Sequence, residues 1–559
     1  MVYIVKQKIH GREYYYLRES IRKGKKVVSR TICYLGKTRE EAEKKAKEVM
    51  ESMKKKVSSE KESAERDLSS KPSLRKLKKL NPSIEELATF CKRRGFVYPS
   101  AEIYGGYSGF WDFGVLGAEL KKNIKDCWWK FYVYGRDDIV GIDGSIITSP
   151  KVWEASGHVE NFNDIFVICK KCHKANKVDA AEIGKVRCPC GGEYDFENAK
   201  KFKLMFETFV GEGGKAYLRP ETAQLIFTNF KFVYGNSRLK LPCGIAQIGK
   251  AFRNEISPRD FLFRCREFEQ MEIEYFIKEN QSCPYEIPDV EILIYSAEAQ
   301  EKGMDAERMS IRKAYKKGII KNDWHAYWLA NCFLWFKGLG ANPERFRLRQ
   351  HRKEELAHYS SDCWDLEYEF PFGWKELQGI ADRGNYDLRR HEEFSKKDLK
   401  LFDEKDGKKF LPHVICEPSL GVERAFLVFM FDSYFSDVEK GNIVLRLHPK
   451  LAPIKAAVFP IVKKKEFEDL AEKIVNDLKK EWNVVYDRAG SIGRRYARND
   501  EIGTPYCITI DGDSLKRNDV TIRDRDTTLQ VRVKINELKE VLRRLIEEGV
   551  SLEEVGDPI

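Results

Sequence analysis

The order of apolar and polar residues divides the chain into segments of different type. On both sides of Lys23-Gly24-Lys25 apolar and polar residues alternate, which predicts two short strands joined by a turn. Thr38-Arg39-Glu40-Glu41 has the form of a capping box, so a helix is predicted to begin there. We therefore expect a small β-hairpin and helix appendage over residues 1–55, followed by a Ser-, Lys- and Glu-rich linker over residues 56–82.

The longest segment, residues 83–447, mixes strand-like alternation with helix-like stretches and is rich in glycine and aromatic residues. Two probable strands, 247–255 and 262–276, flank a short loop and form an antiparallel pair. A helical insertion is expected at about 284–362, where the aromatic residues fit helix packing better than base stacking. The apolar run 425–431 is too short for a membrane span and predicts a buried helix. These patterns predict an α/β protein whose main domain is of α+β type, with an antiparallel sheet and helices.

The last segment, residues 450–559, has the pattern of a separate domain. After Pro449 and Pro453 a probable buried strand is followed by apolar residues at helical spacing, then by further strands and a last amphipathic helix. About 110 residues are enough for an independent core. We predict a mixed-sheet α/β domain here.

The composition indicates a cellular compartment and argues against a membrane protein or a secreted protein. The chain is 42% hydrophobic and 34% charged, which is typical of a solvated globular protein. The longest apolar run is far below the roughly 18 residues of a membrane span, and Met1–Lys6 do not begin a secretion signal. Most of the 14 cysteines are scattered singly, which favours a reducing compartment. We expect a cytoplasmic protein with no membrane partner.

The net charge of +12 is concentrated near the N-terminus. Residues 1–80 hold 24 Lys and Arg against 11 Asp and Glu, so the rest of the chain is close to neutral. A basic block of this kind attracts phosphate backbones by counterion release. RNA contact is our first interpretation of the appendage, and a solubility or partner-docking segment and a fused fragment without a role remain alternatives.

The predicted strand pair carries an unusual combination of side chains. Because side chains alternate along a strand, one face of the second strand holds Arg264, Arg266, Phe268, Gln270 and Glu272. Arg253 and Glu255 share a face of the first strand. Guanidinium groups, an aromatic ring and carboxylates on one surface suit a nucleotide, because they can bind phosphates, stack on a base and bind an amine. The alternative is a solvated sheet face crossed by salt bridges.

Two motifs give this surface a family resemblance. Phe252-Arg253-Asn254-Glu255 with Arg264-Cys265-Arg266-Glu267-Phe268 resembles motif 2 of the class II aminoacyl-tRNA synthetases, and Gly421-Val422-Glu423-Arg424 resembles motif 3. Further segments resemble the archaeal and eukaryotic glycyl branch of that family, among them Arg219-Pro220-Glu221-Thr222-Ala223-Gln224 and Ala381-Asp382-Arg383. The resemblance runs from about Ile84 to Leu545 and implies a class II catalytic domain followed by an anticodon-binding domain.

The resemblance also implies site residues and reactants. The reactants are ATP, Mg²⁺, glycine and tRNA(Gly), and a homodimer is implied, with diadenosine tetraphosphate synthesis as an accessory activity. The implied catalytic residues are Arg253, Arg424 and Glu272. The implied ATP contacts are Arg253, Asn254, Glu255, Arg264, Cys265, Phe268, Glu376, Leu377, Gly421 and Arg424. The implied glycine contacts are Glu221, Glu272, Glu417, Pro418 and Ser419.

Four clustered cysteines suggest a structural metal. Cys169-Lys170-Lys171-Cys172 and Cys188-Pro189-Cys190 lie in a segment of about 165–200 whose pairs have the distance of a zinc ribbon. The second pair is separated by one residue instead of two, so His173 is an alternative ligand. The other alternative is a set of reduced thiols without metal.

Two rival functions use the same fold. A non-catalytic paralogue would keep the fold but lose the ATP arginines, whereas Arg253, Arg264 and Arg424 are all present. A related enzyme could act on another small amino acid or another acceptor, which the C-terminal domain disfavours. Pyrophosphate exchange tests the first rival, and a comparison of the adenylation of glycine, alanine and serine tests the second.

Overall fold

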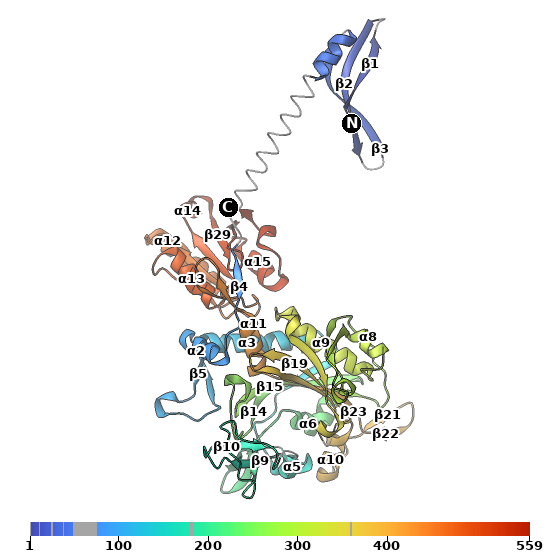
Figure 1. Cartoon of the computed structure of the whole chain (residues 1–559), viewed down its shortest axis with the longest axis vertical. Coiled ribbons are helices and arrows are strands. Elements are labelled where there is room, and N and C mark those ends of the chain that lie inside the picture. Colours follow the sequence, from blue (N-terminus) through green and yellow to red (C-terminus); the bar gives the residue numbers. More distant parts are fainter. Residues whose placement is uncertain are drawn as a thin grey trace. The chain divides into compact units, whose positions relative to one another are not determined.

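The computed structural model describes residues 2–9, 12–23, 26–36, 38–47, 75–178, 183–357 and 360–559. The chain divides into two compact units, Met1–Leu74 and Arg75–Ile559. Figure 1 shows the chain and labels many of the helices and strands of both units.

The first unit contains a three-stranded antiparallel sheet in the order β1-β2-β3. Its strands are β1 (Val2–Ile9), β2 (Arg12–Lys23) and β3 (Lys26–Gly36), and residues 39–47 are helical. The predicted hairpin is therefore present as β2 and β3, and β1 adds a strand that the sequence pattern did not predict. Residues 24–25 of the predicted turn lie outside the described residues, and so do residues 48–74, which comprise the end of the predicted appendage and most of the predicted linker.

The second unit begins inside the segment that was predicted as a linker. Strand β4 (Leu77–Lys79) pairs with β24 (Tyr434–Asp437) in a sheet of order β25-β24-β4. Helix α2 (Ile84–Arg94) follows because Ser83 and Glu86 form a capping box that satisfies two N-terminal amide groups. The end of the predicted linker is thus folded against the catalytic domain.

A nine-stranded sheet organises the catalytic domain (Figure 1). Most neighbouring strands are antiparallel, as predicted, and only the β7–β14 and β16–β18 pairs are parallel. In sheet order the strands are β17 (Glu307–Ser310), β16 (Glu291–Tyr295), β18 (Phe346–Gln350), β19 (Asp362–Phe370), β20 (Gly373–Asp382), β23 (His413–Gly421), β15 (Glu267–Ile277), β14 (Cys243–Phe252) and β7 (Ile139–Ile142).

The prediction of a helical insertion at about 284–362 is wrong in part. Strands β16, β17 and β18 lie in this segment and extend the sheet, between helices α7 (Ala297–Glu301), α8 (Ile311–Lys316) and α9 (Asp323–Gly338). A short apolar run such as Glu291-Ile292-Leu293-Ile294-Tyr295 cannot be assigned to strand or helix by periodicity alone. The interpretation of the aromatic residues is confirmed, because Trp324, Trp328 and Trp335 of α9 are buried in the core.

Helices pack on this sheet and bury one large core. Helix α11 (Val422–Asp432) is buried along most of its length, which confirms the prediction for residues 425–431. The other main helices are α3 (Val115–Trp129), α6 (Ala223–Asn236) and α10 (Tyr386–Ser395). Among the described residues, no helix is both long enough and apolar enough to cross a membrane.

Shorter elements complete the catalytic domain. The cysteine-bearing segment forms a sheet of order β10-β9-β11, and β12-β13-β8 form a second small sheet. These strands are β9 (Asn163–Ile168), β10 (Ala175–Val178), β11 (Lys200–Lys203), β12 (Glu207–Val210), β13 (Gly214–Leu218) and β8 (Ile147–Thr148). The remaining elements are α4 (Pro150–Ala155), α5 (His158–Asn161), β5 (Val97–Pro99), β6 (Trp111–Phe113), β21 (Leu401–Asp403), β22 (Lys408–Phe410) and β25 (Ile443–Leu445).

The C-terminal domain has its own hydrophobic core and a mixed six-stranded sheet in the order β27-β26-β28-β29-β30-β31. β26 pairs in parallel with β27 and β28, and the other pairs are antiparallel. The strands are β26 (Ala456–Pro460), β27 (Val484–Tyr486), β28 (Tyr506–Ile510), β29 (Asp519–Asp524), β30 (Gln530–Lys534) and β31 (Asp557–Pro558). The helices are α12 (Lys465–Leu478), α13 (Ile492–Glu501), α14 (Ser514–Arg517) and α15 (Leu538–Arg543), so the predicted mixed α/β fold is confirmed.

Candidate active site

The loop between β14 and β15 is longer than the sequence predicted. β14 ends at Phe252 and β15 begins at Glu267, so Arg253 and Arg264 belong to the loop and not to a sheet face. Phe261–Phe263 form a short 3-10 helix, so a strand cannot begin at Leu262. The predicted strand ends at 255 and 262 are therefore wrong.

Arg266 has a structural part in this loop instead of the predicted place on a ligand-facing surface. Its Nε donates to the carbonyl oxygen of Glu255 at 2.9 Å, and its Nη1 donates to the carbonyl oxygen of Ser108 at 2.9 Å. These hydrogen bonds connect the two ends of the β14–β15 loop to each other and connect the loop to the segment that contains Ser108.

The guanidinium group of Arg253 is held in place by one backbone carbonyl group and by two aromatic rings. Its Nε donates to the carbonyl oxygen of Pro220 at 3.0 Å. The guanidinium carbon lies 5.3 Å from the ring centre of Phe268 and 5.5 Å from that of Phe162. Stacking of this kind fixes the plane of a guanidinium while leaving N–H donors for a ligand.

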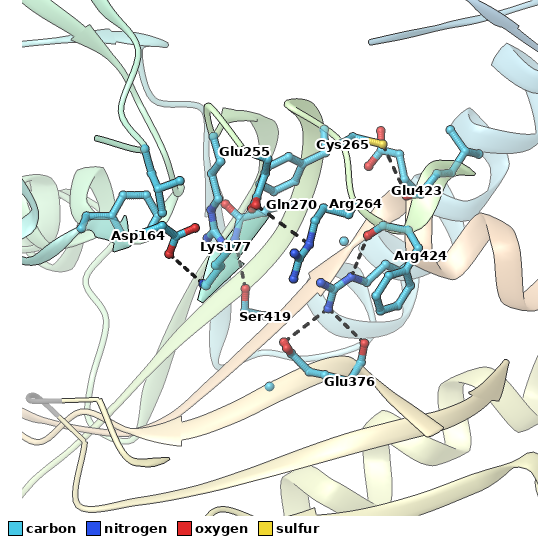
Figure 2. Close-up of a pocket in the computed structure, with 18 of the residues that line it drawn as sticks. Asp164, Lys177, Glu255, Arg264, Cys265, Gln270, Glu376, Ser419, Glu423 and Arg424 are labelled. Atoms are coloured by element: carbon cyan, nitrogen blue, oxygen red, sulfur yellow. Dashed lines mark hydrogen bonds and ion pairs between the residues drawn. The ribbon is translucent and has the colours of Figure 1, made fainter. Parts of the chain in front are cut away.

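Arg424 lies in the first turn of α11, directly after β23. Its Nη1 donates to the carbonyl oxygen of Glu376 at 3.0 Å and lies 3.4 Å from the Oε1 atom of the same residue. The guanidinium carbon lies 4.6 Å from the ring centre of Phe263. Figure 2 shows Arg424 directed toward Glu376 across one side of the cavity. Arg424 in turn lowers the pKa of Glu376, so this carboxylate stays ionised.

One cavity of about 410 Å³ brings most of the predicted nucleotide residues together. Its volume lies in the range of small-molecule sites. The predicted residues that line it are Arg253, Glu255, Arg264, Cys265, Phe268, Glu376, Leu377, Ser419, Gly421 and Arg424. Asn254 is not part of the lining, and its backbone N–H donates to the carbonyl oxygen of Leu204 at 2.7 Å.

The cavity also has a wall that sequence reasoning missed. Asp164 of β9 and Lys177 of β10 form an ion pair at 2.7 Å and line the cavity on the side away from Arg424 (Figure 2). Both residues belong to the cysteine-bearing insertion. No motif marked them, because a single Lys in a short polar strand has no distinctive pattern.

The predicted glycine residues lie beside this cavity, on neighbouring strands. Glu272 of β15 is opposite Ser419 of β23 in the strand register, and Ser419 lines the cavity. Glu417 accepts a 2.8 Å bond from Nη1 of Arg383, and Glu272 accepts a bond from the Thr222 hydroxyl. Glu272 and Glu417 are not part of the cavity lining. They form a second, buried group beside the cavity. Ser419 connects the two, because it lines the cavity and lies opposite Glu272.

The remaining predicted glycine residues border this second group. Glu221 lies 3.2 Å from the Nε2 atom of His158 and accepts from Gln224 Nε2 at 3.0 Å. Pro418 is paired with Ile380 of β20 in the strand register. Glu221 therefore already has two polar partners in the described structure.

Burial and mutual repulsion set the charge state of these carboxyl groups. Burial opposes ionisation of Glu221, but His158 and Arg383 outweigh it and hold its pKa below the usual value. Burial and the charge of Glu221 raise the pKa of Glu272. Burial also raises the pKa of Glu417, and the adjacent Arg383 acts against that rise. The group has more carboxyls than cations and is suited to bind a cation.

The four cysteine sulfurs of the insertion meet at one point. Sγ of Cys169 lies 3.5 Å from Sγ of Cys190, and Sγ of Cys172 lies 3.6 Å from Sγ of Cys188. All four sulfurs lie within 4.8 Å of one another, and His173 is not part of the group. A Cβ at Gly192 would lie 2.7 Å from Sγ of Cys169, so glycine is needed at this position. The single residue between Cys188 and Cys190 is therefore compatible with a close approach of all four sulfurs.

The fold and the cavity define a class of protein. A family model described as the tRNA synthetase class II core domain (G, H, P, S and T) matches residues 206–433, and one described as an anticodon binding domain matches residues 455–545. A prolyl-tRNA synthetase structure from Cryptosporidium parvum has a TM-score of 0.51 at 15% identity, covering 83% of this chain and 77% of that chain. The chain is therefore a class II aminoacyl-tRNA synthetase, as the motifs predicted.

Curated relatives narrow the class to one amino acid. Glycine–tRNA ligases from Acetivibrio thermocellus, Geobacillus thermodenitrificans and Treponema denticola are 47%, 45% and 44% identical to this chain. The alignments cover 82%, 83% and 82% of this chain and 97%, 98% and 95% of those proteins. The chain belongs to the glycine–tRNA ligase family, which uses ATP to join glycine to tRNA(Gly).

The first unit has a different relative. A family model described as the IS1634 family transposase, N-terminal domain, matches residues 2–66. This family model differs from those that match the synthetase domains, and the appendage also lies outside the synthetase resemblance.

Proposed function

We propose that the cavity binds ATP in the orientation that activates the carboxylate of glycine. The observation that carries this proposal is the convergence of Arg253, Arg424 and Phe268 on one cavity. In the proposed complex the adenine ring stacks on Phe268, Arg253 binds the α-phosphate and Arg424 binds the β- and γ-phosphates. Other predicted contacts complete the nucleotide site: Glu255, Arg264, Cys265, Leu377 and Gly421.

Glu376 is the residue that fits a Mg²⁺ ion at this site. Its carboxylate is a hard oxygen donor, and Arg424 keeps it ionised. Such oxygens are what Mg²⁺ prefers, together with phosphate oxygens of the substrate. When bound there, Mg²⁺ would offset the negative charge that develops on the leaving pyrophosphate.

The proposed reaction requires no nucleophilic side chain. The carboxylate of glycine attacks the α-phosphorus of ATP, pyrophosphate leaves, and glycyl-adenylate remains. A ribose hydroxyl at the 3′ end of the tRNA then attacks the carbonyl carbon and releases AMP. The side chains orient the reactants and offset charge as it develops. A second ATP could attack the same adenylate, and this route to diadenosine tetraphosphate stays a prediction.

We place the amino group of glycine at the deeper carboxylates. Glycine offers only two charged ends, so a selective pocket has to bind both and leave no space for a methyl group. The proposed contacts are Glu221, Glu272, Glu417, Pro418 and Ser419. Ser419 supports this placement because it lines the nucleotide cavity and also lies opposite Glu272.

The replacement Glu417→Gln tests the glycine site. It keeps the shape of the side chain but removes a negative charge next to the proposed ammonium position. Hydrogen bonds to charged groups contribute about 1.5–3 kcal/mol, so the KM for glycine should rise roughly 10- to 100-fold. The KM for ATP should stay within about threefold, because Glu417 does not line the nucleotide cavity. Pyrophosphate exchange measures both constants, and an unchanged glycine KM would remove Glu417 from the site.

The four converging cysteines are proposed to hold a structural Zn²⁺. Zinc bound by four thiolates is tetrahedral with Zn–S distances of about 2.3 Å, which places the sulfurs about 3.8 Å apart. The two closest sulfur pairs, at 3.5 and 3.6 Å, are near that spacing. A zinc ion there would hold β9 and β10, and with them Asp164 and Lys177, against the nucleotide cavity.

Metal analysis of the purified protein checks the zinc proposal. About one zinc per chain is expected, and Cys172→Ser combined with Cys190→Ser should lose it. Cys127→Ser is the matched control, because Cys127 is half-buried and lies outside the cysteine group. A wild-type protein without zinc, refolded in the presence of the metal, would contradict the proposal.

The appendage is proposed to contact the tRNA backbone. The excess of 24 Lys and Arg over 11 Asp and Glu in residues 1–80 supports this, as does the match to a domain of transposases, which act on nucleic acid. Its strands are joined to the rest of the chain through residues 48–74, which lie outside the described residues.

Deleting residues 1–55 should make the dependence of tRNA affinity on salt less steep. Each neutralised phosphate contributes roughly 0.7–0.9 to the slope of log K against log salt, so loss of a few contacts is measurable. Pyrophosphate exchange without tRNA is the control and should stay at the wild-type level. An unchanged slope would refute RNA contact by the appendage.

A homodimer in the cytoplasm completes the proposal. Several large apolar side chains near the start of the catalytic domain are highly exposed: Ile103 at 88%, Tyr104 at 87%, Tyr107 at 82% and Val115 at 79%. Large apolar side chains exposed to this degree support a protein interface in this region.

A further inference from the structure

The small sheet of the cysteine-bearing insertion has one face that combines lysines with phenylalanines. In the order β10-β9-β11, Lys177 of β10 and Lys200 of β11 both lie opposite Phe166 of β9 in the strand register. Residues directly opposite each other share a face of a sheet, so Phe166 lies between the two lysines. Asp164 and Phe202, which also lie opposite each other, are two residues further along their strands and extend the same face.

The other face of this sheet packs on the core of the insertion. Val167 and Val178 alternate with the residues of the first face and are buried in the hydrophobic cluster around the cysteines. On the first face the two lysines are exposed and both phenylalanines are partly exposed. The ring centres of Phe166 and Phe202 lie 6.3 Å apart. We refer to Phe166, Lys177, Lys200 and Phe202 as the lysine–phenylalanine face.

This face is continuous with the nucleotide cavity. Lys177 lines the cavity together with Asp164, on the side away from Arg424 (Figure 2). Phe166, Lys200 and Phe202 are not part of the lining. The lysine–phenylalanine face therefore begins in the cavity and continues outside it, so a ligand that contacts the whole face has one end in the cavity.

Lys177 can bind an anion at this junction. Its ammonium group carries three N–H donors, and one of them is enough for the 2.7 Å ion pair with Asp164. The side chain of Lys177 is 39% exposed, so the other donors are accessible to a ligand, whereas the side chain of Asp164 is only 7% exposed. Asp164 therefore holds the ammonium group at the edge of the cavity without blocking it.

The combination of exposed lysines and aromatic rings fits a single strand of RNA. Unpaired bases stack on aromatic side chains while cations bind the phosphates of the same strand. ATP in the cavity cannot account for the face, because Lys200 lies outside the cavity lining. An extended ligand with several phosphates and bases can contact both lysines.

The geometry of the proposed reaction points to the same ligand. Attacking and leaving oxygens lie roughly in line at the α-phosphorus, and the pyrophosphate leaves on the side of Arg424. The activated carbonyl group of glycine therefore lies on the side away from Arg424, where Lys177 lines the cavity. The ribose hydroxyl that attacks this carbonyl has to arrive from there.

We propose that the lysine–phenylalanine face binds the unpaired 3′ end of the tRNA and leads its last ribose into the nucleotide cavity. Lys177 and Lys200 bind phosphates of this strand, and its bases stack on Phe166 and Phe202. The proposal goes beyond the proposed ATP site and rests on it, because the cavity has to be the place where glycine is activated. It gives the cysteine-bearing insertion a part in the transfer of glycine to tRNA.

Binding of labelled tRNA(Gly) to the full-length protein at several salt concentrations tests the face. Lys200→Ala should make the slope of log K against log salt less steep by roughly 0.7, the value for one phosphate of a single strand. Phe202→Ala should weaken binding at least about fivefold through the loss of one stacked base, with the slope unchanged. Lys201→Ala is the matched control and should leave affinity and slope at the wild-type level, because Lys201 is exposed but lies opposite Ile165 on the other face.

A tRNA(Gly) that lacks its unpaired 3′ nucleotides shows which part of the RNA is bound. The wild type, Lys200→Ala and Phe202→Ala should bind this shortened tRNA alike. Pyrophosphate exchange without tRNA reports whether each variant is folded, because both residues lie outside the nucleotide cavity. If Phe202→Ala has lost this exchange, Lys200→Ala decides alone, since an exposed lysine is replaced at little cost to the fold.

Two results would overturn the proposal. One is a wild-type salt slope in Lys200→Ala, and the other is a difference between variant and wild type that persists with the shortened tRNA. Failure of the proposed ATP site is seen in a different measurement, the pyrophosphate exchange of Arg253→Ala, in which no tRNA takes part.

Discussion

Replacing Arg253 with alanine should lower kcat of glycine-dependent pyrophosphate exchange by roughly 10²- to 10³-fold, the usual loss for a group that stabilises developing charge. The guanidinium is held by Pro220 and by the rings of Phe268 and Phe162, so it is fixed before the substrate arrives. Because no side chain acts as a nucleophile in the proposed reaction, the arginines carry most of the catalytic effect. The KM for glycine should change little, since the amino group binds elsewhere.

Arg259→Ala is the matched control for this prediction. Arg259 lies in the same loop, its side chain is 66% exposed, and it is 3.7 Å from its neighbour Asp260. Its loss should leave kcat within about twofold, as expected for a surface ion pair. Arg253→Lys keeps the charge without the planar fork and should fall between wild type and Arg253→Ala. Equal kcat values for Arg253→Ala and Arg259→Ala would remove Arg253 from the catalytic residues.

Replacing Arg383 with methionine should lower the free energy of unfolding of the catalytic domain by about 3–5 kcal/mol, the cost of breaking a buried ion pair. The side chain of Arg383 is 1% exposed and binds Asp387 at 2.8 and 2.9 Å and Glu417 at 2.8 Å. Methionine has a similar volume but leaves two buried carboxylates without a cation. Urea denaturation followed by tryptophan fluorescence measures the loss.

Two further variants distinguish lost charge pairing from lost packing. Arg390→Met removes a partly exposed arginine from α10, whose ion pair with Glu393 is 3.6 Å long, and should cost less than about 1 kcal/mol. Adding Asp387→Asn and Glu417→Gln to Arg383→Met removes the uncompensated charges and should restore part of the stability. If the triple variant is as unstable as Arg383→Met alone, the loss comes from packing.

Several parts of the fold could be predicted because local sequence decides them. The capping box predicted at Thr38 to Glu41 lies at the start of the helical residues 39–47, and the apolar run 425–431 is buried in α11, as predicted. The C-terminal domain was predicted because its strands and helices alternate and each has a clear apolar face. The segment 284–362 was harder, because short apolar runs fit a strand as well as a helix.

In the candidate site, too, some features could be predicted from the sequence and others could not. The sequence motifs identified Arg253, Phe268 and Arg424, which line one cavity. They did not reveal that Arg266 stabilises a loop, because the predicted strands extended past Phe252 and began before Glu267, where the chain forms a loop with a short 3-10 helix. They also missed Asp164 and Lys177, which line the cavity, since a single charged residue in a strand has no pattern of its own.

The amino-acid sequence by itself determined the family and the reaction, and it predicted residues that line one cavity, because these depend on motifs in which neighbouring residues act together. Only the tertiary structure brought Glu272, Glu274 and Glu417 within 4.8 Å of one another, because β15 and β23 lie about 140 residues apart in the chain and side by side in the sheet. The same reason applies to the four cysteine sulfurs, whose close approach could not be predicted from their spacing along the chain.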